Sequence, residues 1–149
     1  MANELIHKIE WDEFSVGDAG FHGNLSFVKW LIKKQTLEWD PELALSCCLM
    51  SKENNFYFLK NMHDLGYTPG MRSCQAAARL GKIATLQWLK EIGCDVENMK
   101  DITQVLAEEG HLETLKWANS NGFPCDQETL DAAIYANRRE VVRYLRHHN

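Results

Sequence analysis

Residues 81–93 read GKIATLQWLKEIG and residues 110–122 read GHLETLKWANSNG, and the two segments align without a gap. Three further segments align with them: GNLSFVKWLIKKQ from Gly23, NNFYFLKNMHDLG from Asn54 and NRREVVRYLRHHN from Asn137. The five copies therefore recur every 27 to 31 residues. Self-similarity at such a period is typical of repeat proteins, in which each copy is one supersecondary unit that stacks on its neighbours.

Three columns of the alignment are apolar and predict one buried stripe along a helix, because residues three apart share a helix face. With the first residue of each copy as position 0, the columns are Leu25, Phe56, Ile83, Leu112 and Arg139 at position 2; Val28, Leu59, Leu86, Leu115 and Val142 at position 5; and Leu31, Met62, Leu89, Ala118 and Leu145 at position 8. Position 6 carries long polar side chains and is expected to face solvent. Position 7 holds Trp30, Trp88, Trp117 and Tyr144, which we interpret as packing between repeats, with a ligand platform as the alternative.

A shorter helical segment rich in small residues precedes each of the later copies, at residues 43–50, 73–79, 102–109 and 129–136. The glycines after the longer helices, Gly66, Gly93 and Gly122, are expected to end them in a left-handed conformation. Asp40 followed by Pro41 predicts a helix start. The repeat is therefore a short helix, a turn, a longer helix, a glycine stop and a loop.

The two ends of the array are expected to be modified. Gly17 and Gly20 weaken the first helix, by about 1 kcal/mol each relative to alanine, and predict a frayed or shortened cap. The last copy adds Arg138, Arg139, Arg143 and Arg146, which predicts an end that faces water.

Composition limits the functional classes. The 149 residues carry a net charge of −5, and 45% of them are hydrophobic, enough for a continuous core. No stretch approaches the roughly 20 apolar residues of a membrane span, and no leader is visible at the start. The five cysteines form no bridging framework, which favours buried thiols over zinc ligands and predicts a reducing, intracellular, cytoplasmic setting. Nucleic acid and membranes are not expected as partners, since the excess of acids offers no attraction to phosphates.

Three stretches carry a resemblance to a known family. Ala76-Ala77-Ala78-Arg79-Leu80-Gly81, Gly110-His111-Leu112-Glu113-Thr114-Leu115-Lys116-Trp117 and Asn121-Gly122-Phe123-Pro124-Cys125-Asp126 resemble ankyrin repeats, and more narrowly the Trp-containing, short-loop subtype abundant in giant DNA viruses and some protists. The Thr-Pro-Leu-His tetrapeptide usual in that family is absent, and the period is shorter than its usual 33 or so residues.

The resemblance implies an all-α fold, an ankyrin-like α-solenoid of about five helix-turn-helix repeats with reduced hairpin loops. A single domain is expected over residues 1–149, with cap repeats at 1–36 and 123–149. The central repeats are expected at 40–66, 67–93 and 94–122. For a host-interaction protein of a virus, the setting would be the host cytoplasm or nucleus.

Such arrays usually bind a protein partner on the concave face, so the resemblance implies an adaptor, inhibitor or effector. Its candidate contact residues are Arg72, Gln75, Arg79, Gln104, Glu108, Gln127, Asp131 and Tyr135. The alternatives are a ubiquitin-ligase substrate adaptor, because residues 3–9 resemble the opening of an F-box, and a self-assembling structural protein. A monomer or weak homo-oligomer is expected.

No catalytic motif, cofactor motif or metal-ligand spacing is found, so we expect no enzyme activity. Gly17, Gly20 and Gly23 are spaced like a phosphate-binding loop, but no apolar strand precedes them and no Lys-Ser or Lys-Thr pair follows.

Overall fold

The computed structural model describes residues 13–34, 41–50, 56–94 and 99–148. Within these ranges the regular structure is entirely α-helical and contains no strand, which confirms the predicted all-α class. The chain divides into two compact units, Met1–Tyr67 and Thr68–Asn149. Among the helices described, none is both long enough and apolar enough to cross a bilayer.

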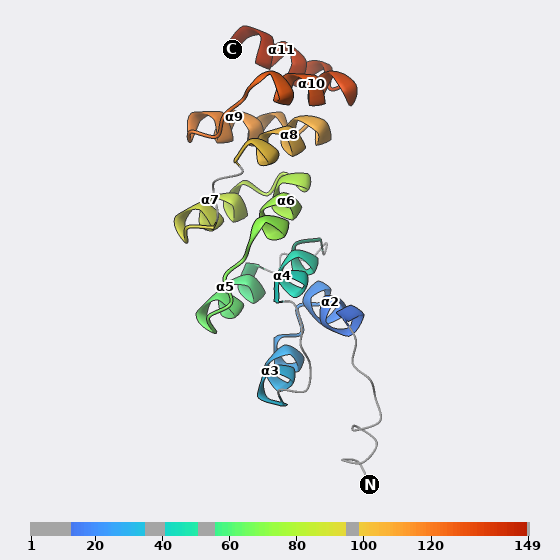
Figure 1. Ribbon diagram of the computed structural model, residues 1–149, viewed down its shortest axis with the longest axis vertical. Helices are drawn as coiled ribbons and strands as arrows, with labels where there is room; N and C mark the ends of the chain where they lie inside the picture. Colours follow the sequence, from blue (N-terminus) through green and yellow to red (C-terminus); the bar gives the residue numbers. More distant parts are fainter. Residues whose placement is uncertain (1–12, 35–40, 51–55, 95–98, 149) are drawn as a thin grey trace. The chain divides into compact units, whose positions relative to one another are not determined.

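The first unit contains four described helices, which form two consecutive pairs. They are α2 (Glu13–Phe21), α3 (Leu25–Lys34), α4 (Pro41–Met50) and α5 (Phe56–Asp64) (Figure 1). Helix α2 packs along α4, while α3 lies against α2 and α5 against α4. The start of α4 at Pro41 agrees with the predicted proline at the first helical position, whereas Asp40 lies outside the described residues.

The contact between α2 and α4 is backbone against backbone. A Cβ added at Gly20 would lie 2.8 Å from the Ala44 Cα, so only glycine allows this approach. The predicted shortening of the first helix was wrong, because α2 continues for nine residues through both Gly17 and Gly20. The prediction considered only the low helix propensity of glycine and not the close helix packing that glycine makes possible.

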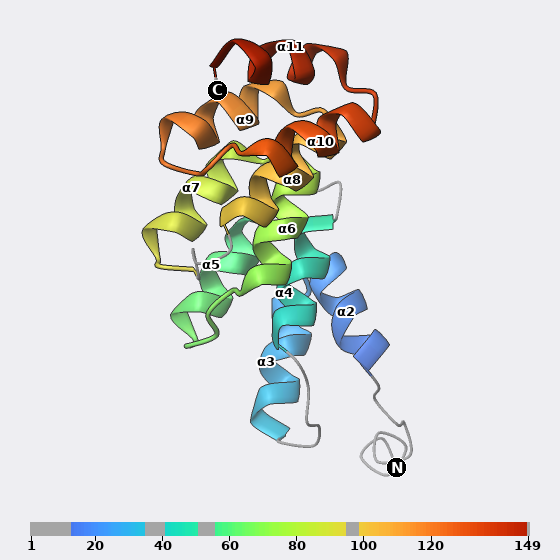
Figure 2. The ribbon, with the colours of Figure 1, turned by 45° about the horizontal axis from the view of Figure 1, so that its top comes forward.

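The second unit contains three helix pairs. They are α6 (Met71–Arg79) with α7 (Ile83–Glu91), α8 (Met99–Glu109) with α9 (Leu112–Ser120), and α10 (Gln127–Tyr135) with α11 (Arg139–His148). Helix α8 lies between α6 and α10. Both views show these three helices side by side (Figures 1 and 2), and we call the first helix of each pair the inner helix. Helices α7 and α9 form a second layer beside them (Figure 2). All four predicted short helices are present, and each begins two or three residues before its predicted start. With 9 to 11 residues they are about as long as the helices that follow them, so the predicted difference in length was wrong.

Left-handed residues end the helices. Gly66, Gly93 and Gly122 have φ values of 91°, 73° and 86°, which confirms the predicted glycine stops. At Gly93, its own N–H donates to the Lys90 carbonyl (3.1 Å) and the Cys94 N–H donates to the Leu89 carbonyl (3.0 Å). This is the Schellman pattern, which satisfies carbonyls that the helix end would leave unpaired.

A second left-handed series occupies position 0 of the repeat, between the helices of each pair, and the sequence analysis did not predict it. Its described members are Gly23, Gly81, Gly110 and Asn137. The left-handed Asn137 follows the rule that asparagine adopts this conformation more readily than other non-glycine residues.

The core follows the predicted stripe at two of its three columns. At position 5, Val28, Leu59, Leu86 and Leu115 are buried, while the terminal Val142 is half-buried. At position 8 the described side chains are buried, and Leu31 lies outside them. Position 2 is only half-buried in four copies and exposed at Arg139, so its assignment to the core was wrong.

Position 4, and not position 2, supplies the third buried column. Phe58, Thr85, Thr114 and Val141 are buried there. At about 100° per residue, position 4 lies roughly 40° from position 8 around the helix, whereas position 2 lies roughly 120° away. This column was not recognised in the sequence because two of its members are polar threonines. The Thr114 hydroxyl can be buried because it donates a hydrogen bond to the Gly81 carbonyl (3.0 Å).

The aromatic row at position 7 is half-buried in every described copy. The Trp117 ring packs on Phe123, with centroids 5.6 Å apart. The Tyr144 hydroxyl accepts a hydrogen bond from the Asn119 amide (3.1 Å), which links α11 to α9. These contacts agree with the interpretation of the row as packing with a polar edge.

Candidate binding surfaces

The inner helices of the second unit present one continuous set of side chains to solvent. Alignment of α6, α8 and α10 on the left-handed residues Gly81, Gly110 and Asn137 yields three columns on these helices. The columns are Arg79, Glu108 and Tyr135; Gln75, Gln104 and Asp131; and Arg72, Asp101 and Glu128. Within each helix the three residues are spaced three and four apart, which places them on one side of it. We call these nine residues the inner-helix face.

The inner-helix face is accessible. Gln75 and Gln104 are half-buried and the other seven residues are exposed. A hydrogen bond from the Gln104 amide to the Glu128 carboxylate (2.8 Å) joins α8 to α10 across the face. Tyr135 is a prominent member, with 90% of its surface exposed. An exposed tyrosine combines a large apolar ring with a hydroxyl, a combination that is common at protein interfaces.

Seven of the eight contact residues predicted from the sequence fall in these columns. The exception is Gln127, which is exposed at the start of α10 and donates to the Asp131 carboxylate (2.8 Å). The prediction missed Asp101 and Glu128. Both lie nine residues before a left-handed residue, so a count backwards from Gly110 and Asn137 finds them.

Charge divides the inner-helix face along its length. Helix α6 contributes two guanidinium groups, from Arg72 and Arg79. Helices α8 and α10 contribute four carboxylates, from Asp101, Glu108, Glu128 and Asp131. This division limits which surfaces can bind without charge repulsion.

Helices α6 and α8 are each held at the C-terminal end by a side chain from the next helix pair. The His111 ring nitrogen Nε2 lies 2.6 Å from the Arg79 carbonyl oxygen, and the Arg138 Nε donates to the Glu108 carbonyl (2.6 Å). These two side chains occupy equivalent positions in successive pairs. The second and third pairs of the unit therefore each help to terminate the inner helix that precedes them.

Threonines anchor the opposite ends of α8 and α10. The Thr103 hydroxyl donates to the Pro124 carbonyl (2.7 Å) and lies 3.2 Å from the Thr129 hydroxyl. Asp126 caps α10 by accepting from the Thr129 N–H (3.2 Å). Helix α8 is therefore held at both ends, α6 at its C-terminal end and α10 at its N-terminal end. Side chains on backbone that is held in this way lose less entropy on binding.

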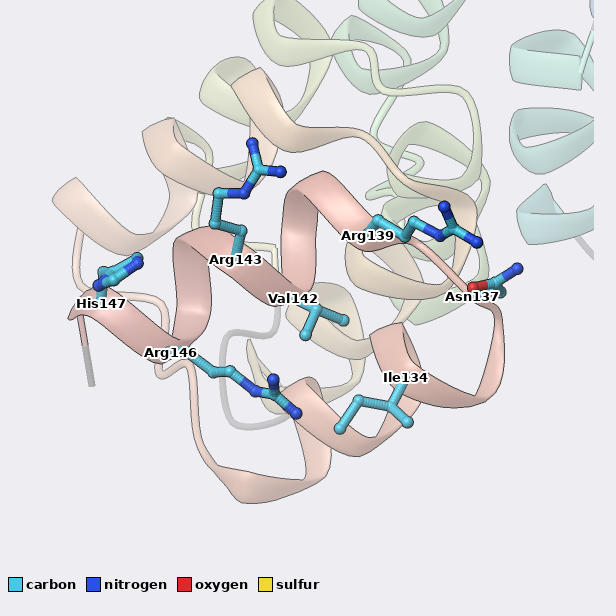
Figure 3. A pocket seen from close by; sticks show the side chains of 7 residues that line it. All are labelled: Ile134, Asn137, Arg139, Val142, Arg143, Arg146 and His147. Carbon is cyan, nitrogen blue, oxygen red and sulfur yellow. The ribbon is translucent and has the colours of Figure 1, made fainter.

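A second surface lies at the end of the second unit, on α10 and α11. Its hollow has a volume of about 510 Å³ and is lined by Ile134, Asn137, Arg139, Val142, Arg143, Arg146 and His147 (Figure 3). Ile134 comes from α10 and Val142 from the middle of α11, with Arg143 and Arg146 on either side of Val142 (Figure 3). All four arginines of the last copy are exposed, as predicted.

This hollow lies on the last helix pair described, α10 and α11. Ile134 is 47% exposed, while the equivalent residues in α6 and α8, Ala78 and Ala107, are fully buried. Val142 is likewise more exposed than its equivalents Leu86 and Leu115. The basic side chains therefore surround the apolar spot that the next pair covers elsewhere in the unit.

The described residues show no metal site, and the half-buried Cys125 is a poor nucleophile at neutral pH. Among the described residues, no three His, Cys, Asp or Glu side chains come close enough together to hold a metal ion. Cys125 is half-buried, and its burial, with a smaller effect of the Asp126 carboxylate, raises its pKa to about 11. Its thiolate, the reactive form, is scarce at neutral pH.

We expect the alkylation rate of Cys125 by iodoacetamide to rise about tenfold per pH unit and to level off only near pH 11. An unperturbed thiol levels off near pH 9, the ordinary value. The measurement is mass spectrometry of the peptide that contains Cys125 after timed labelling. Asp126→Asn is expected to shift the profile slightly to lower pH, because burial is the larger cause. A plateau already at pH 9 in the wild-type protein would contradict the environment described for this thiol.

No protein-family model matches this sequence, and a search of curated proteins found no significant match. The geometry of the molecule is therefore the basis for the function proposed next.

Proposed function

We propose that this chain is a protein-binding module of ankyrin-like repeats that holds a polypeptide partner on its inner-helix face. The observation that carries the proposal is the set of three columns at equivalent positions of α6, α8 and α10, in which seven of the nine residues are exposed and two are half-buried. Stacked helix pairs with their inner helices side by side are the arrangement expected of such repeats. Six residues connect Ser120 to Gln127, and no strand occurs there, in keeping with reduced hairpin loops.

An adaptor, inhibitor or effector is the role that fits a surface of mixed charge without a catalytic group. Two guanidinium groups beside four carboxylates favour a partner with the opposite order of charges. Exposed side chains of this kind give specificity and a salt-dependent association rate more than raw affinity.

The proposal predicts that Arg79→Glu and Tyr135→Ala each weaken partner binding roughly tenfold or more. The measurement is affinity capture from a cell lysate with the wild-type chain as bait, followed by quantification of each captured protein with the variants. Both substitutions leave the backbone unchanged, including the Arg79 carbonyl that contacts His111.

Two matched controls lie outside the inner-helix face. Lys29→Glu reverses an exposed charge on α3, and Tyr57→Ala removes a tyrosine that is 74% exposed on α5. Both controls are expected to capture the same proteins as the wild-type chain. If both face variants retain every captured protein, the inner-helix face is not the binding site.

The exposed apolar spot at Ile134 favours self-assembly as the second candidate function, with the end of one copy covered by another copy. Light scattering distinguishes the two, because a strict monomer at micromolar concentration excludes assembly. The residues that resemble an F-box, 3–9, lie outside the described residues, so the ubiquitin-ligase alternative stays a prediction from the sequence alone.

A further inference from the structure

Two cysteines far apart in the sequence meet inside the second unit. Cys74 lies in the first half of α6, and Cys94 follows the glycine that ends α7. Their sulfur atoms are 2.7 Å apart, and both side chains are buried, with exposed fractions of 7% and 2%. A disulfide bond measures about 2.05 Å, so the sulfurs need to approach by only about 0.7 Å to reach it.

Hydrogen bonds position the second thiol. The Cys94 sulfur donates to the Pro69 carbonyl (3.1 Å) and lies 3.5 Å from the Gly70 carbonyl. Both carbonyls precede the first turn of α6, the helix that carries Cys74. The thiol of Cys94 is therefore held against the start of α6, beside its neighbour.

The next helix pair has an equivalent contact between a hydroxyl and a carbonyl group. Thr103 occupies in α8 the place of Cys74 in α6, seven residues before the left-handed glycine. Its hydroxyl reaches the turn after α9, where it donates to the Pro124 carbonyl (2.7 Å). Two successive repeats therefore have a contact between this position of the inner helix and the turn after the second helix of the pair. In the first of these repeats both contacting groups are thiols, from Cys74 and Cys94.

We propose that Cys74 and Cys94 form a reversible intramolecular disulfide when the protein meets hydrogen peroxide. One thiol loses its proton and attacks a peroxide oxygen, which breaks the O–O bond, forms a sulfenic acid and releases water. The second thiol loses its proton and attacks that sulfur, which forms the S–S bond and expels hydroxide, and hydroxide takes up a proton to become a second water. Peroxide accepts the two electrons, and a dithiol reductant restores both thiols.

Contact between the two sulfur atoms favours this reaction. Once a small oxidant has reached one thiol during local opening, the partner sulfur is already in place to attack the sulfenic acid. The bond would hold the start of α6, which carries Arg72, to the turn after α7. This inference does not depend on the proposed function, and its test needs no partner.

The test is a peptide map of the wild-type chain after exposure to hydrogen peroxide and alkylation of the remaining thiols. Trypsin cleaves after Arg72, Arg79, Lys90 and Lys100, so the disulfide joins the peptides 73–79 and 91–100. We expect this linked pair as the main product, lost after treatment with dithiothreitol, and a loss of about 2 Da from the monomer mass. Oxidation is expected to raise the melting temperature by roughly 5 to 10 °C, because the bond closes a loop in the unfolded chain.

Two variants complete the test. Cys94→Ser is expected to abolish both the linked peptides and the rise in melting temperature, whereas Cys48→Ser, which alters a buried cysteine of the first unit, is expected to retain both. The peptide map of the wild-type chain decides the matter even if Cys94→Ser fails to fold. The proposal is overturned if peroxide leaves Cys74 and Cys94 fully alkylatable, converts them to sulfinic acids, or links either of them mainly to another cysteine.

Discussion

Leu115→Ala is expected to lower the free energy of unfolding by about 3 kcal/mol. Leu115 is fully buried in α9, at position 5 of the repeat and within the buried stripe of that helix. Removal of three carbons from such a site costs their transfer free energy and leaves a cavity that the surrounding helices fill only in part. Urea unfolding followed by circular dichroism at 222 nm measures the loss.

Leu112→Ala is the matched control, because it makes the same chemical change one turn earlier in the same helix. Leu112 is at position 2 and only half-buried, so we expect a loss of about 1 kcal/mol. Equal losses of unfolding free energy at Leu112 and Leu115 would mean that α9 buries position 2 as deeply as position 5, contrary to the arrangement described.

Gly81→Ala is expected to destabilise the protein by about 2 to 4 kcal/mol, for two separate reasons. Gly81 has a φ of 61°, a left-handed conformation that strains any residue with a Cβ. The added Cβ would also lie 2.8 Å from the Cγ atom of the His111 ring, which packs there to contact the Arg79 carbonyl. Thermal and urea unfolding of the purified variants measure the loss.

Gly122→Ala isolates the first reason, because Gly122 is left-handed but has no atom within 4 Å of its added Cβ. Its loss is expected to be about 1 to 2 kcal/mol. In a double-mutant cycle, His111→Ala should offset part of the effect of Gly81→Ala, since it removes the ring that the new methyl group meets. Strictly additive losses at Gly81 and His111 would show that the two do not meet in the folded protein.

The sequence predicted the helices and their glycine stops because both depend on local chemistry. Apolar spacing located the columns at positions 5 and 8, and Gly66, Gly93 and Gly122 marked the helix ends. Two features of the core depend on tertiary contacts and were missed. The burial of Thr114 is explained by its hydrogen bond to the Gly81 carbonyl. The need for glycine at position 20 is explained by the close approach of Ala44. Neither contact can be read from the sequence.

Most of the inner-helix face was found from the family resemblance, because the repeat transfers helix positions from one copy to the next. Asp101 and Glu128 were missed, and each lies one residue before the start predicted for its helix, at 102 and 129, whereas the structure begins these helices at Met99 and Gln127. The hollow at Ile134 and the meeting of Cys74 with Cys94 depend on how helices and turns approach one another. Residues twenty apart carry no local sign that their side chains touch.

Under the proposed function, the spacing of α6, α8 and α10 limits the kind of peptide that would fit the inner-helix face. Packed helices are about 10 Å apart, and an extended chain advances about 3.3 Å per residue. An extended peptide that crosses the three helices therefore meets a new helix at about every third residue. The favoured motif places an acidic residue opposite the arginines of α6 and basic residues three and six positions further on, opposite the carboxylates of α8 and α10. The same motif written backwards would set like charges against each other, so the direction of the bound chain is chosen along with its sequence.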